Sequence, residues 1–177
     1  MISVSSLLWV IPMSLYLADL VVGLVHMTGD FFQLPQFIHH HEAPRWMTTK
    51  GYVHHTFRSY LLSLIVVGIF RFHHPLWITT TLLSIHGNEI HAWLHVKHQE
   101  TVPNWIQWLQ KNHLILDSAS HLGHHRNQYD RQFCTLTGWA NPLLNCLSIP
   151  LYSRCASFRE SLLQSPTYLS TVQSFRA

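Results

Sequence analysis

The stretch "VSSLLWVIPMSLYLADLVVGLV" (residues 4–25) decides the fold class of this 177-residue chain. It carries a single ionisable side chain, Asp19. As an α-helix it would rise about 33 Å, at about 1.5 Å per residue, and a hydrocarbon core of about 30 Å needs a helix of this length. It lacks the basic leader and small-residue cleavage site of a signal peptide, so we predict a membrane helix.

Two further apolar stretches follow, at residues 59–70 and 75–90. The composition agrees with a membrane protein, because 47% of the residues are hydrophobic and only 11% are charged, against about a quarter charged in ordinary globular domains. Residues 102–116 have an amphipathic pattern that suits a helix lying at the membrane interface, with Trp105 and Trp108 as anchors.

We therefore predict an all-α integral membrane domain over residues 1–152 and a polar, Ser-rich tail over residues 153–177. The domain should have about three membrane-embedded helices plus interfacial amphipathic helices. Residues 59–70 would rise only about 18 Å as a helix. They must either recruit polar residues from Val53 onward or form a shallow hairpin with the third stretch.

With this topology, one side of the membrane receives most of the histidines and basic residues. Seven basic residues before the tail fall on the histidine side, and Arg71 is the exception. The positive-inside rule makes that side cytoplasmic, or stromal in a plastid. The net charge of +3 comes without any Lys/Arg block, so nucleic acid is not an expected partner.

Histidine is the unusual residue of this chain, with 16 copies against 8 Asp plus Glu. In "HAWLH" (91–95) two histidines are four residues apart, and in "HLGHH" (121–125) three share the i, i+3, i+4 spacing. Each set therefore lies on one face of a helix. The histidines predicted to share one compartment are His26, His40, His41, His91, His95, His121, His124 and His125.

Three polar residues are expected to support these histidines. Asp19 and Asp30 fall on the same helical face as His26, and Asn88 precedes His91 by three residues. A carboxylate within a membrane span is costly and usually faces the bundle interior or a functional site. We predict that Asp19 and Asp30 orient histidine ligands through the second ring nitrogen, with Asn88 on the same stripe as His91.

Eight histidines on one side indicate two metal ions. Imidazole suits iron, zinc, copper and nickel, whereas a structural zinc site needs four ligands and normally includes cysteine. The Glu-x-x-His pairs of soluble carboxylate-bridged di-iron bundles are absent. A histidine-rich, carboxylate-poor cluster at the ends of membrane helices fits the oxygen-activating di-iron centre of membrane desaturases and hydroxylases.

Six segments, in their order and spacing, resemble the lipid desaturase family, which includes plasmanylethanolamine desaturases and a plastid palmitate desaturase acting on phosphatidylglycerol. The segments are "LADLVVGLVHMTGD" (17–30), "HHHEAP" (39–44), "NEIHAWLH" (88–95), "LQKNHLIL" (109–116), "HLGHH" (121–125) and "FCTLTGWANPLL" (133–144). The family's eight-histidine pattern falls on the eight histidines named above.

The resemblance implies a membrane-bound, O2-dependent desaturase with two non-haem iron ions. The implied reaction inserts a double bond into a glycerophospholipid chain, with conversion of plasmanylethanolamine to a vinyl-ether plasmalogen favoured. Trans desaturation of palmitoyl phosphatidylglycerol is the alternative. Electrons would come from a separate carrier such as cytochrome b5 or ferredoxin, since the chain shows no haem, flavin or nucleotide motif. The expected location is the endoplasmic reticulum membrane, with a plastid or bacterial inner membrane as alternatives.

Two positions depart from the family pattern. Ser120 and Tyr129 stand where the plasmanyl branch of the family typically has histidines. These departures support a second hypothesis, a non-enzymatic membrane protein that is a metal-binding or degenerate relative acting through partners. Hydroxylation in place of desaturation, the choice of lipid and the oligomeric state also stay open at this level.

Overall fold

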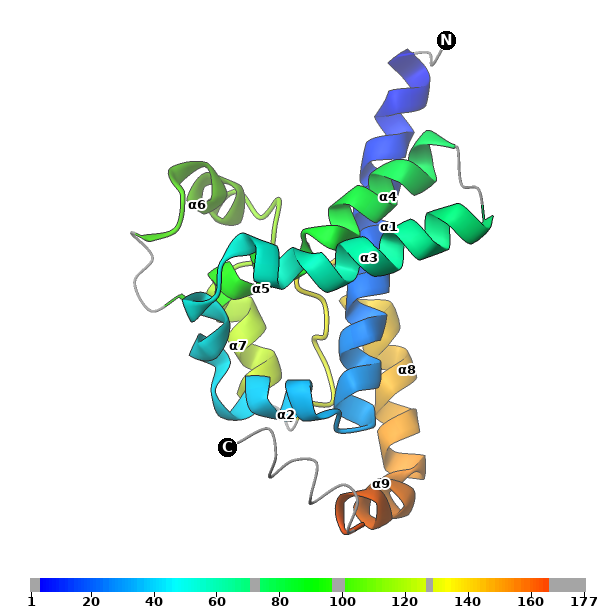
Figure 1. Ribbon diagram of the computed structural model, residues 1–177, viewed down its shortest axis with the longest axis vertical. Helices are drawn as coiled ribbons and strands as arrows, with labels where there is room; N and C mark the ends of the chain where they lie inside the picture. Colours follow the sequence, from blue (N-terminus) through cyan, green and yellow to red (C-terminus); the bar gives the residue numbers. More distant parts are fainter. Residues whose placement is uncertain (1–3, 71–73, 97–100, 127–128, 166–177) are drawn as a thin grey trace.

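The computed structural model describes residues 4–70, 74–96, 101–126 and 129–165, and within these ranges the chain is helical without any strand (Figure 1). The elements are α1 (Val4–Phe31), α2 (Pro35–Glu42), the 3-10 helix η1 (Pro44–Thr49), α3 (Tyr52–Phe70), α4 (Pro75–Ile85), α5 (Gly87–Leu94), α6 (Asn104–Lys111), α7 (Ser118–Arg126), α8 (Asn141–Arg154) and α9 (Ala156–Leu163). The predicted all-α class is confirmed for the described residues.

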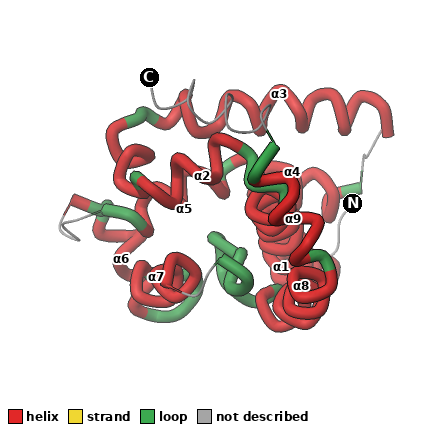
Figure 2. Tube along the Cα trace, turned by 90° about the horizontal axis from the view of Figure 1, so that it is seen from below, coloured by secondary structure: helices red, strands yellow, loops and turns green. Residues whose placement is uncertain are grey.

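Helix α1 is the axis on which the other elements assemble. It has 28 residues, so it continues beyond the predicted stretch and carries His26 and Asp30 in its last turns. Helices α4 and α8 both pack against it, α4 along the N-terminal part and α8 along the C-terminal part (Figure 1). Figure 2, seen from below, shows α1 and α8 side by side and nearly end-on, with α3 lying across.

Among the described residues, α1 alone is both long and apolar enough to cross a membrane, over Leu8–Phe31. Helix α3 begins at Tyr52, so the short second stretch does recruit the polar residues before it, and the helix packs against α4. Much of α3 remains exposed, including Leu61, Leu64 and Ile69. The total of about three membrane-embedded helices stays a prediction.

The third apolar stretch does not form one helix, which corrects the sequence prediction. Helix α4 ends at Ile85 and α5 starts at Gly87, with His86 between them. A side chain at position 87 would lie 2.8 Å from a methyl carbon of Val22, so glycine allows the close approach to α1. The break redirects α5 and carries His91 toward the interior, where it is buried.

Helix α6 has the amphipathic character expected for residues 102–116. Ile106 is buried and packs with Val102 and Ile115, while Trp105 and Trp108 are exposed. Trp105 also meets Trp93 edge to face, with ring centroids 6.0 Å apart. Exposed tryptophans on one side of a short helix are typical of interfacial helices.

The predicted boundary at residue 152 falls inside a helix. Helix α8 runs through to Arg154, and the Tyr152 hydroxyl donates to the Met27 carbonyl at 3.3 Å. Helix α9 follows, so the first part of the predicted polar tail is helical. Residues 166–177 of that tail, and Arg71, lie outside the described residues.

The core forms where a buried segment between α7 and α8 meets α1. This segment, residues 133–137, is at most 7% exposed throughout. A side chain at Gly23 would come within 2.5 Å of Leu144, so α1 and α8 approach closely there. The core cluster consists of Met27, Phe31, Phe133, Cys134, Ala140, Leu144 and Tyr152.

Candidate metal centre

The fold brings all eight predicted histidines into one cluster. They come from four places in the chain, namely the end of α1, the end of α2, α5 with the residue after it, and α7. Their ring nitrogens, together with one Asp30 carboxylate oxygen, fall into two groups, and within each group the ligand atoms lie within 4.8 Å of one another. The five-histidine group is His40, His91, His95, His121 and His125, and the Asp30 group is His26, Asp30, His41 and His124.

Three Nε2 atoms of the five-histidine group form a tight triangle. The distances are 2.8 Å between His91 and His121, 3.1 Å between His91 and His95, and 3.1 Å between His95 and His121. Metal–imidazole bonds are about 2.1 Å long, so two such ligands at a right angle would have nitrogens about 3.0 Å apart. The triangle therefore has the dimensions of one face of an octahedral site.

The other two members complete this group. The His40 ring lies with its centroid 4.5 Å from that of His91 and 4.9 Å from that of His125. Both ring nitrogens of His40, and Nε2 of His125, are buried without a hydrogen-bond partner. Buried polar atoms without partners are rare in native proteins. These ring nitrogens lie close together without enough hydrogen atoms to form hydrogen bonds with one another. A cation bound between them would satisfy their lone pairs, so the residues fit a metal.

The Asp30 group differs because it contains a carboxylate. Asp30 Oδ1 lies 2.7 Å from His41 Nε2, and Oδ2 lies 3.2 Å from His124 Nε2. His26 Nε2, one turn before Asp30 on the same helix, is 3.5 Å from Oδ2. Three imidazoles and one carboxylate suit a second divalent metal.

The second ring nitrogen of His124 has its own partner. Nδ1 donates to the backbone carbonyl of Arg131 at 2.7 Å, and Nε2 is directed at the Asp30 group. Such an outer hydrogen bond is common for metal-binding histidines. For His124 the orienting partner is therefore a backbone carbonyl, and Asp30 meets the nitrogen that would bind the metal. This corrects the expected role of Asp30 toward this histidine.

Asp19 lies away from the histidines, which also corrects the sequence prediction. Its Oδ1 accepts from the backbone N–H groups of Leu136 and Thr137 at 3.1 and 3.0 Å, and Oδ2 accepts from Ala140 at 3.1 Å. The carboxylate is fully buried. Asp19 thus anchors the buried segment before α8 to α1.

Asn88 lines the same cavity as His91. Its side-chain amide donates to the backbone carbonyl of His55 at 3.3 Å rather than to a histidine ring. His55 lies between two acceptors, since Nδ1 is 2.6 Å from Glu89 Oε2 and Nε2 is 2.9 Å from the Met47 carbonyl. Sequence reasoning missed this His55–Glu89 pair, which links α3 to α5, because no local spacing relates residues so far apart.

Burial favours the neutral form of the histidines in the five-histidine group. It lowers the pKa of His40 and His121 well below the ordinary value of 6.5. It also lowers the pKa of His95 to about 4 and that of His125 to about 2, with repulsion from neighbouring histidines adding to the effect. Neutral imidazole is the form that binds metals.

The two departures from the family pattern have different surroundings. Ser120 is exposed, and its backbone N–H donates to Asp117 Oδ1 at 2.7 Å in the first turn of α7. A histidine missing there removes nothing from either group. Tyr129 lies against the Asp30 group, with its ring centroid 3.8 Å from that of His41.

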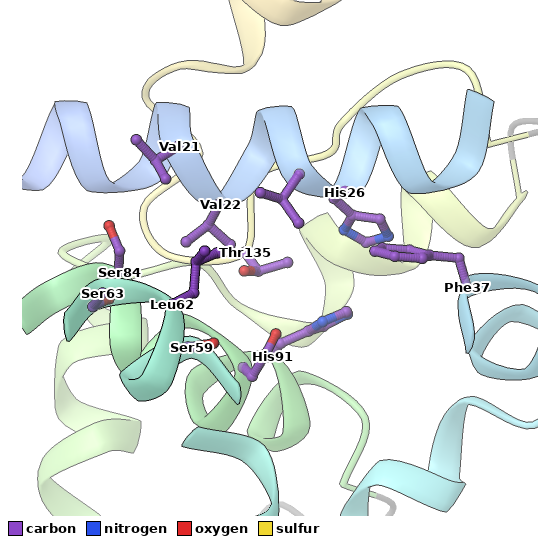
Figure 3. A pocket seen from close by; sticks show the side chains of 12 residues that line it. Val21, Val22, His26, Phe37, Ser59, Leu62, Ser63, Ser84, His91 and Thr135 are labelled. Carbon is purple, nitrogen blue, oxygen red and sulfur yellow. The ribbon is translucent and has the colours of Figure 1, made fainter. Parts of the chain in front are cut away.

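A cavity of about 170 Å³ adjoins both groups (Figure 3). Its wall includes His26 from the Asp30 group and His91 from the five-histidine group. The remaining lining residues are mostly aliphatic or hydroxyl-bearing, and they come from α1, α2, α3, α4, α5 and the buried segment: Val21, Val22, Val25, Phe37, Ser59, Leu62, Ser63, Ser84, Asn88 and Thr135.

A model of the lipid desaturase domain matches residues 15–158, which include all eight histidines and Asp30. The chain belongs to the lipid desaturase family. It is similar to plasmanylethanolamine desaturase of Myxococcus xanthus, with 27% identity over 82% of this chain and 59% of the relative. It is likewise similar to plasmanylethanolamine desaturase 1 of Mus musculus, with 27% identity over 70% of this chain and 55% of the relative.

A plant relative is more distant. Chloroplastic fatty acid desaturase 4 of Arabidopsis thaliana is 24% identical over 72% of this chain and 44% of the relative. The chain spans about half the length of the curated relatives it matches. No solved structure is significantly similar to it.

Proposed function

We propose that this lipid desaturase family member is a membrane-bound, O2-dependent enzyme with two non-haem iron ions. The observation that carries the proposal is the shared wall of the cavity. His26 and His91, one from each ligand group, face the same apolar space. A hydrocarbon segment held there would lie beside both metals.

The chemistry is the removal of two hydrogen atoms from adjacent chain carbons, which leaves a double bond between them. With two further electrons and two protons, one O2 is reduced to two waters. Iron bound by the two groups would supply the activation of O2. The protein would hold the metals through the eight imidazoles and the Asp30 carboxylate, and Val21, Val22 and Leu62 would exclude water from the chain.

The two extra electrons would come from a separate carrier such as cytochrome b5 or ferredoxin. We place the enzyme in the endoplasmic reticulum membrane, with the histidine cluster on the cytoplasmic side. A plastid or bacterial inner membrane is the alternative location. Helix α1 would cross the bilayer, and α6 would lie at its surface through Trp105 and Trp108.

The substrate we propose is a plasmanylethanolamine, which would become a vinyl-ether plasmalogen. Two of the relatives carry the name plasmanylethanolamine desaturase. A palmitoyl phosphatidylglycerol, desaturated in trans, is the second substrate to test, and the similarity to a relative named as a chloroplastic fatty acid desaturase supports it.

Lipid mass spectrometry tests the activity. Cells without vinyl-ether lipids receive an alkyl-ether precursor and express the wild-type chain, His124→Ala or His39→Ala. His39 is the matched control, because it lies in α2 beside two cluster histidines but its ring packs on Trp46. We expect vinyl-ether lipid with the wild type and His39→Ala, and at least a hundredfold less with His124→Ala. A new double bond in another lipid class would assign the second substrate, and no change in any lipid, with a reductase supplied, would refute the activity.

Metal analysis tests the centre separately. The purified wild type should contain about two iron ions per chain, and His121→Ala, which removes one corner of the nitrogen triangle, should contain about one. An iron-free wild type purified under reducing conditions with iron supplied would favour the non-catalytic hypothesis.

A further inference from the structure

We propose that the Thr135 hydroxyl binds the oxygen atom that links the substrate chain to glycerol. The inference rests on the proposed function, and it adds a residue that selects where along the chain the double bond forms. Thr135 lies in the buried segment before α8, between residues that hold the segment in place.

The Thr135 hydroxyl differs from its neighbours, because the backbone N–H groups on either side form hydrogen bonds and the hydroxyl forms none among the described residues. Thr135 is 0% exposed, and its Oγ1 has no hydrogen-bond partner among the described residues. Its neighbours are bonded: the Cys134 N–H donates to Asn141 Oδ1 at 3.0 Å and the Leu136 N–H donates to Asp19. These hydrogen bonds fix the backbone around Thr135. The hydroxyl therefore keeps its position and can form a hydrogen bond with a bound molecule, since the described residues offer it no partner.

A partner can approach Thr135 from the cavity, which Thr135 lines next to Val22 and beneath α1 (Figure 3). Aliphatic side chains form part of the wall, with Val21 and Val25 from α1 and Leu62 from α3, and serine side chains from α3 and α4 add hydroxyl groups. The aliphatic part suits methylene groups, which cannot accept a hydrogen bond. A chain of methylenes alone would leave the buried hydroxyl unpaired, which is unfavourable.

An ether or ester oxygen in the chain removes this penalty, because it accepts the hydrogen bond from Thr135. The cavity holds about 170 Å³, less than the several hundred Å³ of a site that encloses a whole small ligand. The oxygen and the reacting carbons must then lie within a few bonds of each other, since His26 and His91 line the same small space. The double bond is therefore expected at the glycerol end of the chain and not in its middle.

Thr80 provides a matched control for the substitution Thr135→Val. It is 6% exposed and its Oγ1 also lacks a partner, but it lies in α4 and does not line the cavity. Thr80→Val thus removes a comparable buried hydroxyl from a place outside the cavity.

The experiment compares an alkyl-ether glycerophosphoethanolamine with an analogue that has CH2 in place of the ether oxygen. The purified protein in nanodiscs is assayed for kcat/KM in air and for equilibrium binding without O2. We expect the wild type to prefer the ether lipid, Thr135→Val to reduce this preference about three- to tenfold in both assays, and Thr80→Val to keep it. Iron content should be the same in all three proteins.

An unchanged preference in Thr135→Val would overturn the inference, whatever the overall activity. The binding assay needs no turnover, so it separates the two proposals. If no protein forms product but Thr135→Val alone loses the binding preference, the inference stands and the proposed function fails. If product forms and the middle of the chain is oxidised, the inference fails and desaturation stands.

Discussion

Asp19 and Asp30 occupy the same face of α1, about three turns apart, and their exposed fractions are 0% and 1%. From sequence they have the same expected role. In the structure Asp30 meets three histidines, whereas Asp19 accepts three backbone N–H groups. Two buried carboxylates on one helix therefore have different roles. Asp30 belongs to the candidate metal centre, and Asp19 anchors the buried segment before α8.

The difference follows from what each carboxylate faces. Asp19 is opposite the buried segment before α8, whose backbone has no helix or strand to satisfy its N–H groups. Asp30 is opposite α2 and α7, which present imidazoles. The anchored segment also bears on the metal centre. The Arg131 carbonyl, which accepts the hydrogen bond that orients His124, lies just before the residues that Asp19 anchors.

The largest effect is expected for Asp19→Ala. The substitution leaves three buried N–H groups unpaired, and each costs about 1–3 kcal/mol, so we expect a loss of about 3 kcal/mol or more in the free energy of unfolding. Asp19→Asn keeps one acceptor oxygen and should lose less. Thermal unfolding of the purified proteins measures both. Asp130→Ala is the control, since that carboxylate forms a surface pair with Arg131, and an equal loss there would contradict the anchoring role.

A smaller and more local effect is expected for Asp30→Asn. The amide keeps the shape of the side chain but removes the only carboxylate of the two ligand groups. Metal affinity of the Asp30 group should fall about 10–100-fold, while the five-histidine group keeps its metal. Metal titration of the stripped protein should then show one weakened and one unchanged site. Two equally weakened sites, or a change of the same size in Asp130→Asn, would mean that the groups do not act separately.

The smallest effect is the pH dependence of the metal-free protein. Burial holds the pKa of His95 at about 4 and that of His125 at about 2, below the ordinary value of 6.5. Between pH 6.5 and about 4 the unfolded chain therefore binds more protons than the folded one, and stability falls as the pH falls. The unfolding temperature should drop by several degrees from pH 7.5 to 5.0.

The Asp19 variant is a control for this pH dependence of the unfolding temperature. Asp19→Asn should lower the unfolding temperature at every pH without changing its slope, because Asp19 is not among the groups that shift the pKa of His95 or His125. Saturating metal should flatten the curve near neutral pH, since bound imidazoles no longer take up protons. A metal-free protein equally stable at pH 7.5 and 5.0 would contradict the buried, neutral cluster.

Sequence spacing was sufficient for the parts of this protein that depend on local geometry. Helical periodicity places His91 with His95, and His121 with His124 and His125, because side chains three or four residues apart share a face. The length and apolarity of residues 4–25 predict α1. These features depend on the sequence of one continuous segment.

Only the tertiary structure decided how the histidines divide into two groups, that Asp30 joins one of them, and that Asp19 joins neither. It also decided the break at His86, the His55–Glu89 pair and the orphan hydroxyl of Thr135. Each depends on partners that lie more than thirty residues away or on the path of a buried segment. Periodicity sets which face a residue occupies, but the element packed against that face sets what the residue contacts.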